Sequence, residues 1–264
     1  MAEPIIKSRS ARLFIILGGF FVANAIVAEF SGVKIFSLED SLGVDRANIP
    51  IFGGSFSFHL TAGVLLWPVV FVMTDLINEY YGPRGVKLLS YLAAGLITYA
   101  FVMISFAMQL SPSEFFRLDG NIADSDAAFG SVFGQGLWII IGSLVAFLVA
   151  QVLDVFIFHR IKKHTGEKRI WLRATGSTLV SQLIDSFVVL FIAFYIGPRI
   201  EGAAEREWTL HQVSVTATGN YIYKFVIALL MTPIIYLVHA WIEKYLGKPL
   251  AKEMKEQAMG AYKA

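Results

Sequence analysis

Two copies of one polar pattern lie inside long apolar runs of this sequence. The strings LVAQVLDVFIF and LVSQLIDSFVV share five of their eleven positions. The first copy carries Gln151 and Asp154, and the second carries Gln182 and Asp185. On a helix, a spacing of three residues puts the amide and the carboxylate on the same face. Because a carboxylate near the middle of a bilayer costs about 2.5–3.5 kcal/mol on insertion scales, the repeat predicts a functional polar site.

Four further polar residues lie in or beside apolar segments. Asp75 ends another apolar run, so three carboxylates could line one polar cavity; alternatively, they could only join helices through neighbouring hydroxyl and amide groups. Lys224 is the only basic residue well inside a run, and we expect it to pair with an acid, preferably Asp185. This pairing could be structural or part of substrate binding. Glu79 is best interpreted as a solvated charge at the inner membrane surface. We nevertheless keep Glu79 and Asn24 as candidate binding residues.

The composition predicts one transmembrane domain. The 264 residues are 56% hydrophobic and only 16% charged, and the mean hydropathy is +0.63. Soluble domains are about 45–50% apolar and about 25% charged. The net charge of +2 does not imply a nucleic-acid partner, and the absence of cysteine excludes disulfides and thiol chemistry. We therefore expect an all-α polytopic membrane protein.

Six apolar segments are long enough to cross a bilayer. They cover about residues 13–28, 58–78, 86–110, 137–158, 175–196 and 218–242. Sixteen Lys and Arg residues lie on the side of the two termini, and five lie on the other side. Since cytoplasmic loops are rich in Lys and Arg, both termini are predicted to be cytoplasmic. The start of the second segment alternates like a strand, so residues 51–60 could be irregular or helical.

Enzymatic chemistry finds little support in the motifs. The chain has no Gly-x-x-x-x-Gly-Lys-[Ser/Thr] loop for ATP and no His-Glu-x-x-His pair for zinc. Asp154 and Asp185 are flanked as Gln-x-x-Asp, which differs from the glycine-rich settings of intramembrane aspartyl proteases. We therefore expect neither an enzyme nor a cofactor or metal site, and we keep a membrane enzyme only as an alternative.

Several of these segments resemble one known family. The string FVMTDLINEYYG around Asp75 is similar to the Thr-Asp-Leu signature of the queuosine precursor transporters. QVLDVFIF, the ATGSTL stretch leading to DSF, and YKF at Lys224 resemble further segments of that family. The resemblance covers about residues 60–245. It implies a six-helix, multi-pass protein of the bacterial inner membrane, embedded in lipid, that imports 7-cyano-7-deazaguanine and also 7-aminomethyl-7-deazaguanine for tRNA queuosine synthesis. Assembly as a homodimer is left open.

The candidate polar residues suit such a substrate. A deazaguanine presents an N–H and an exocyclic NH₂ side by side, and one carboxylate can accept from both. Its carbonyl can accept from a glutamine NH₂ or from Lys224, and its flat ring can stack on Phe or Tyr. The candidate binding residues are Asp75, Gln151, Asp154, Gln182, Asp185, Lys224, Asn24 and Glu79. We predict a secondary transporter, with the binding subunit of an ATP-driven vitamin uptake complex as the alternative.

Overall fold

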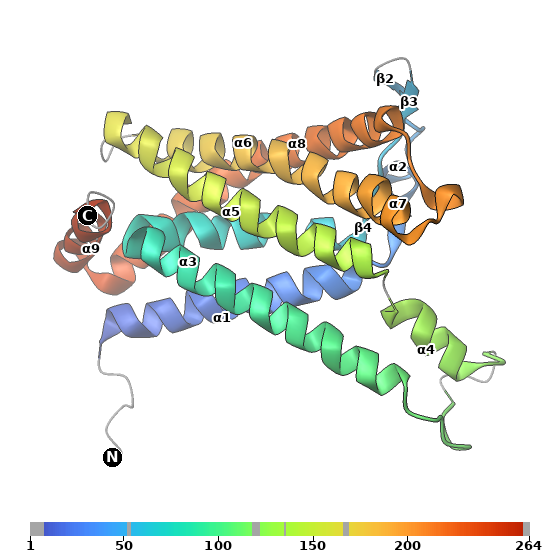
Figure 1. Cartoon of the computed structure of the whole chain (residues 1–264). Helices are drawn as coiled ribbons and strands as arrows, with labels where there is room; N and C mark the ends of the chain where they lie inside the picture. The colour runs from blue at the N-terminus through green and yellow to red at the C-terminus, as the bar shows by residue number, and fades with distance from the viewer. Residues whose placement is uncertain (1–7, 52–53, 118–121, 135, 166–168, 261–264) are drawn as a thin grey trace.

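The computed structural model describes residues 8–51, 54–117, 122–134, 136–165 and 169–260, and helices dominate this part of the chain (Figure 1). The long helices are α1 (Arg9–Ser31), α3 (Trp67–Met108), α5 (Leu137–Thr165), α6 (Ile170–Leu190) and α8 (Leu210–Leu246). The short helices are α2 (Leu38–Leu42), α4 (Ser125–Phe133), α7 (Gly197–Glu201) and α9 (Lys248–Gly260). A π-helical segment, Phe191–Ile196, joins α6 to α7 without a break in the helical path.

Long apolar helices make up most of this fold. Five helical segments in the described ranges are long and apolar enough to cross a membrane. Large apolar side chains point away from the protein, among them Phe20, Tyr99 and Leu230, which are 60%, 61% and 62% exposed. Such surfaces are suited to lipid, where helices satisfy their own backbone hydrogen bonds. The predicted all-α membrane class is therefore confirmed.

Helix α3 contains a sharp turn at Gly82-Pro83. Its 42 residues include one residue with non-helical backbone angles, Gly82, at φ 68° and ψ −170°. Glycine adopts this positive φ without the steric cost that a Cβ would bring. Figure 1 shows the chain running away from the strands along the first arm of α3 and returning along the second. The predicted segments 58–78 and 86–110 thus fall largely on the two arms of one interrupted helix.

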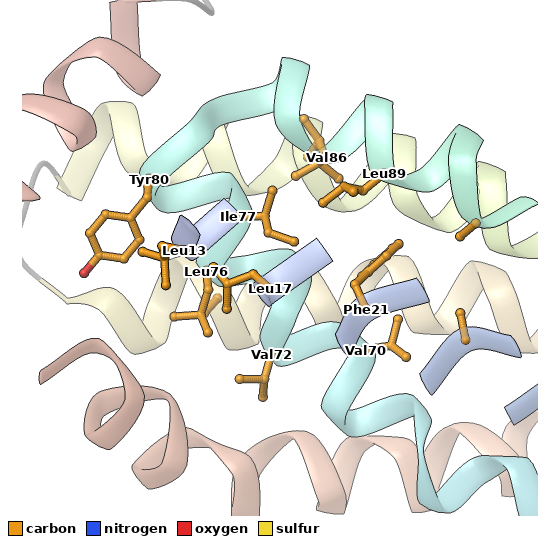
Figure 2. Close-up of a cluster of buried hydrophobic side chains, with 14 of the residues drawn as sticks. Leu13, Leu17, Phe21, Val70, Val72, Leu76, Ile77, Tyr80, Val86 and Leu89 are labelled. Atoms are coloured by element: carbon orange, nitrogen blue, oxygen red, sulfur yellow. The ribbon is translucent and has the colours of Figure 1, made fainter. Parts of the chain in front are cut away.

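The first helix packs against both arms of α3. Leu17 and Phe21 of α1 are buried together with Val70 of the first arm and Val86 and Leu89 of the second. Figure 2 shows these side chains gathered between the α1 and α3 ribbons. This apolar cluster fixes the first arm of α3, which carries Asp75 and Glu79.

Helices α5, α6 and α8 form the other half of the molecule. Helix α6 packs along α5 on one side and along α8 on the other. Figure 1 shows α5 and α6 side by side and running in opposite directions. The two Gln-x-x-Asp patterns therefore lie on neighbouring antiparallel helices.

A small cap of strands precedes α3. Strand β1 (Ile35–Ser37) pairs antiparallel with β4 (His59–Thr61), and β2 (Ile49–Ile51) pairs with β3 (Gly54–Phe56). A 3₁₀ turn, Ala62–Leu65, then leads to α3. The predicted second segment is thus not helical at its start. Helix α3 begins at Trp67 because Pro68 suits the first turn, where its missing N–H costs nothing.

Glu39 of α2 holds this cap together. The side chain is only 4% exposed. Its Oε1 accepts hydrogen bonds from the backbone N–H groups of Phe58 at 2.8 Å and Ala47 at 3.4 Å, and the Ser37 hydroxyl donates to its Oε2 at 3.4 Å. Burial acts to raise the pKa of Glu39, but these hydrogen bonds to the ionised form outweigh it, and the pKa is lowered from 4.5.

The lowered pKa predicts that the cap loosens in acid. A carboxylate with a lowered folded pKa adds stability above its unfolded pKa and loses it as the pH falls through the folded pKa. Limited proteolysis between α1 and α3 should therefore accelerate below about pH 4.5 in the wild-type protein. Glu39→Gln should be cleaved faster already at pH 7, and its cleavage should depend less on pH. Equal pH dependence in both proteins would contradict this role.

Helix α9 covers the turn of α3 at the opposite end of the molecule. A Cβ at Gly82 would lie 3.1 Å from the carbonyl oxygen of Ala258, so the two backbones approach closely. Lys255 of α9 donates to Glu243 of α8 at 2.6 Å, and its Nζ lies 5.4 Å from the centre of the Tyr80 ring. The C-terminal helix is thus tied to both α3 and α8.

Candidate functional site

Two adjoining cavities lie among α3, α5, α6 and α8. The first is a partly open cavity whose wall includes Asp75, Gln182 and Lys224. The second is also partly open, and its polar residues are Gln151, Asp154, Ser181, Gln182 and Asp185. Both cavities share Trp67, Phe71 and Gln182. Six of the eight candidate residues are therefore brought together in one connected region.

Asp75 lies on the first arm of α3 and faces the first cavity. Its side chain is 2% exposed, and its Oδ1 has no hydrogen-bond partner among the described residues. The adjacent Thr74 bonds back to the Val70 carbonyl at 3.0 Å and accepts from Gln151 Nε2 at 3.3 Å, which links α3 to α5. Asp75 thus lies beside a hydrogen bond that links α3 to α5, and it keeps one acceptor oxygen available.

Asp154 is held by hydroxyl groups of the next helix. Ser181 and Thr178 of α6 lie within 3.4 Å and 3.5 Å of its Oδ1. The residue is 6% exposed and belongs to the second cavity. Thus Asp154 is both part of the cavity wall and a link between α5 and α6, which combines the two alternatives of the sequence analysis.

The two glutamines provide further acceptors. Gln182 is 2% exposed and Gln151 is 5% exposed. Within the described ranges, the Oε1 atoms of both lack a hydrogen-bond partner. A buried polar atom left unsatisfied costs about 1–3 kcal/mol. A ligand that brings N–H donors to these atoms would remove that cost.

The cavities also share an aromatic wall. Trp67 and Phe71 lie one turn apart on α3 with their ring centres 6.0 Å apart and their planes at 20°. Tyr223 adds a third ring to the first cavity. Trp67 is not among the candidates predicted from the sequence, although its spacing of four and eight residues from Phe71 and Asp75 puts all three on one face of a helix.

The predicted pair of Lys224 and Asp185 is confirmed. Lys224 Nζ lies 2.6 Å from Asp185 Oδ2, and the side chains are 15% and 19% exposed. The pair joins α8 to α6. Lys224 belongs to the first cavity and Asp185 to the second, so the pair lies where the two cavities meet.

A double-mutant cycle should detect this pair. Lys224→Met leaves the Asp185 carboxylate without its ammonium partner and should lower the thermal stability of the protein in detergent. Adding Asp185→Asn should recover part of the loss, with a coupling of at least about 0.5 kcal/mol, as residues in contact show. Strictly additive losses would mean that the contact contributes nothing to stability.

Glu79 is not solvated, which corrects the favoured interpretation from the sequence. Its side chain is fully buried at 0% exposure. Arg173 of α6 binds it through two hydrogen bonds of 3.0 Å and 2.8 Å, and Lys162 of α5 lies at 3.0 Å. The three residues, here called the Glu79 cluster, tie α3, α5 and α6 together. Since Glu79 follows Asp75 by one helical turn, the cluster lies about one turn of α3 away from the first cavity.

Asn24 is not part of the cavities. Its amide donates to the carbonyl of Phe20 one turn earlier in α1, at 2.8 Å. Glu29, near the end of the same helix, instead contacts α5, because the Ser143 hydroxyl donates to it at 2.5 Å.

Comparison with known proteins identifies relatives of this chain. A family model described as "Putative vitamin uptake transporter" matches residues 61–238. A "Probable queuosine precursor transporter" of Bacillus subtilis is 31% identical over 69% of this chain and 72% of its own length. The "Queuosine precursor transporter" of Escherichia coli is 28% identical over 53% of this chain and 58% of its own length.

A third relative, from Haemophilus influenzae and named "Probable queuosine precursor transporter", is 28% identical over 74% of this chain and 76% of its own length. No solved structure matches the chain. The relatives are named as transporters and not as enzymes, in line with the sequence analysis. The apolar helices and these relatives together identify a multi-pass bacterial membrane protein. The chain belongs to the vitamin uptake transporter family, which includes the queuosine precursor transporters.

Proposed function

We propose that this protein imports queuosine precursors, and that the two adjoining cavities bind the 7-deazaguanine ring. The main support is the set of buried acceptor atoms on Asp75, Gln151 and Gln182, which lack partners within the described part of the chain and lie beside an aromatic wall. Relatives named as queuosine precursor transporters point to the same class of cargo.

The two adjacent donors on the deazaguanine edge match the Asp75 carboxylate. Its adjacent N–H and NH₂ groups can donate to the Asp75 carboxylate, which accepts two hydrogen bonds. Its carbonyl can accept from Lys224 or from the Gln182 NH₂ group, since both line the cavity that contains Asp75. The flat ring would stack on Trp67 or Phe71. Edge hydrogen bonds with ring stacking are the general way in which proteins bind an isolated base.

We further propose six membrane crossings in the inner membrane, with both termini in the cytoplasm. The two arms of α3 run in opposite directions on either side of Gly82, so each arm would make one crossing. The Lys and Arg asymmetry supports the sidedness. A reporter fused after Ala264 that is active only in the cytoplasm would agree with this topology, and activity only in the periplasm would overturn it.

A binding measurement tests the cargo. Purified protein in detergent should bind 7-cyano- and 7-aminomethyl-7-deazaguanine, as measured by isothermal titration. Adenine is the matched control, because its ring is similar but its edge places an acceptor nitrogen where a guanine carries N–H. Tighter binding of adenine than of either deazaguanine would refute the proposed contacts.

Transport in liposomes separates the remaining alternatives. We propose a secondary transporter, so purified protein alone should move labelled deazaguanine without ATP. Uptake that requires a copurifying ATPase would identify a binding subunit of an ATP-driven complex instead. Recovery of chemically altered cargo would indicate a membrane enzyme.

A further inference from the structure

A separate hollow with three cations lies where α1 begins and α8 ends. It is a wide, open hollow at the surface, and it is lined by Arg9, Arg12, Trp241, Lys244 and Tyr245. Three of these five residues are basic, two are aromatic and none is acidic. The hollow shares no lining residue with the two substrate cavities.

Two hydrogen bonds to the backbone hold Arg9 and the start of α1 in place. Arg9 Nη1 donates to the backbone carbonyl of Tyr245 at 3.2 Å, which joins α1 to α8. The Tyr81 hydroxyl donates to the carbonyl of Ser10 at 2.7 Å, which joins α1 to α3. The hollow is therefore formed by fixed helix ends.

One acid adjoins these residues in the sequence. Glu243 precedes Lys244, and it accepts a 2.6 Å hydrogen bond from Lys255 of α9. Arginine and lysine side chains are hydrogen-bond donors only, so three of the five lining side chains present N–H groups that an anion can accept from.

The position of the hollow indicates the kind of anion. Helices α1 and α8 are long and apolar enough to cross a membrane, so their first and last turns lie at a membrane surface. Trp and Tyr are enriched at this depth, where their rings contact both headgroups and acyl chains. Trp241 is 64% exposed on α8, beside the basic residues.

We propose that this hollow binds the headgroup of an anionic phospholipid. The phosphodiester would lie among Arg9, Arg12 and Lys244, and Trp241 and Tyr245 would contact the glycerol and upper acyl region. Basic pockets between transmembrane helices are established sites for such headgroups. The aromatic side chains favour a lipid over free phosphate, because phosphate has no apolar part for them to cover.

Native mass spectrometry of the full chain in neutral detergent tests this site. The wild-type protein should retain phosphatidylglycerol at least about 10-fold more tightly than phosphatidylcholine. The triple variant Arg9→Gln, Arg12→Gln, Lys244→Gln should lose about 100-fold in affinity for phosphatidylglycerol, or about 5-fold for each cation. The three residues are exposed, so circular dichroism should be unchanged.

A matched control removes three exposed cations from the region between α5 and α6: Arg160→Gln, Lys163→Gln, Arg169→Gln. It should bind phosphatidylglycerol within about 3-fold of wild type. An equal loss in both triple variants would mean diffuse attraction and overturn the site. Equal retention of the two lipids would overturn it as well. Inorganic phosphate that displaces the lipid at equal concentration would identify a free-anion site instead.

Discussion

Asp75→Asn should lower the affinity for 7-cyano-7-deazaguanine by about 10- to 150-fold. The substitution preserves side-chain size but replaces a charged acceptor with an amide, and a hydrogen bond to a charged group contributes about 1.5–3 kcal/mol. In the first cavity, Asp75 offers an oxygen that has no other partner in the described structure. Isothermal titration should measure the loss, and uptake into liposomes should fall in parallel.

Asp45→Asn is a suitable control for this prediction. It makes the same chemical change at an exposed position that lines neither cavity. Its affinity and uptake should equal those of the wild type. If Asp75→Asn also binds and transports normally, this carboxylate does not contact the cargo, and the role of Asp75 is structural.

Glu79→Leu should destabilise the protein by about 3–5 kcal/mol, the usual effect of removing one partner of a buried ion pair. The substitution leaves Arg173 and Lys162 next to a leucine, although both are at most 1% exposed. Two cations would then remain in an apolar environment and repel each other. Thermal unfolding in detergent should show the loss, and Arg173→Met combined with Glu79→Leu should recover part of it.

The exposed pair of Glu201 and Arg206 provides the matched control. Its oxygen and nitrogen atoms lie 3.2 Å apart, but Arg206 is 66% exposed. Surface pairs contribute about 0–1 kcal/mol, so Glu201→Leu should be nearly neutral. A similar loss in both leucine variants would show that burial of the Glu79 cluster has no special energetic role.

The polar residues of the cavities could be predicted from the sequence because a charged side chain in an apolar segment has a high free-energy cost and is therefore rare. Asp154, Asp185 and Lys224 each interrupt a hydrophobic segment, and such residues rarely lie there without a partner. The preference for Asp185 as the partner of Lys224 followed from the direct connection of the fifth and sixth segments. The structure has this pair at 2.6 Å.

The sequence did not reveal the Glu79 cluster. Lys162 and Arg173 lie outside the predicted segments 137–158 and 175–196, so they counted as solvated loop residues. Helices α5 and α6 continue past these apolar limits, to Thr165 and from Ile170. Hydropathy shows where a helix leaves the apolar layer. It does not show that a basic residue in the next turn of that helix pairs with a carboxylate of another helix.

The repeated Gln-x-x-Asp pattern also has two different outcomes. Because α5 and α6 run in opposite directions, equal sequence does not give equal surroundings. Asp154 accepts from hydroxyl groups of α6, whereas Asp185 pairs with the ammonium of Lys224. The repeat predicted which residues would be important, and the orientation of the helices determined what each of them contacts.

The close contact between Gly82 and Ala258 has a consequence for the biosynthesis of the protein. A ribosome makes the turn of α3 long before α9, because Gly82 and Ala258 are 176 positions apart in the sequence. All five long apolar helices are therefore synthesised before α9 can cover the turn at Gly82. Until then, Tyr80 lacks the neighbouring ammonium of Lys255. Docking of α9 thus follows the synthesis of all five long apolar helices described above, and a nascent chain that stops before α9 would leave the turn of α3 uncovered.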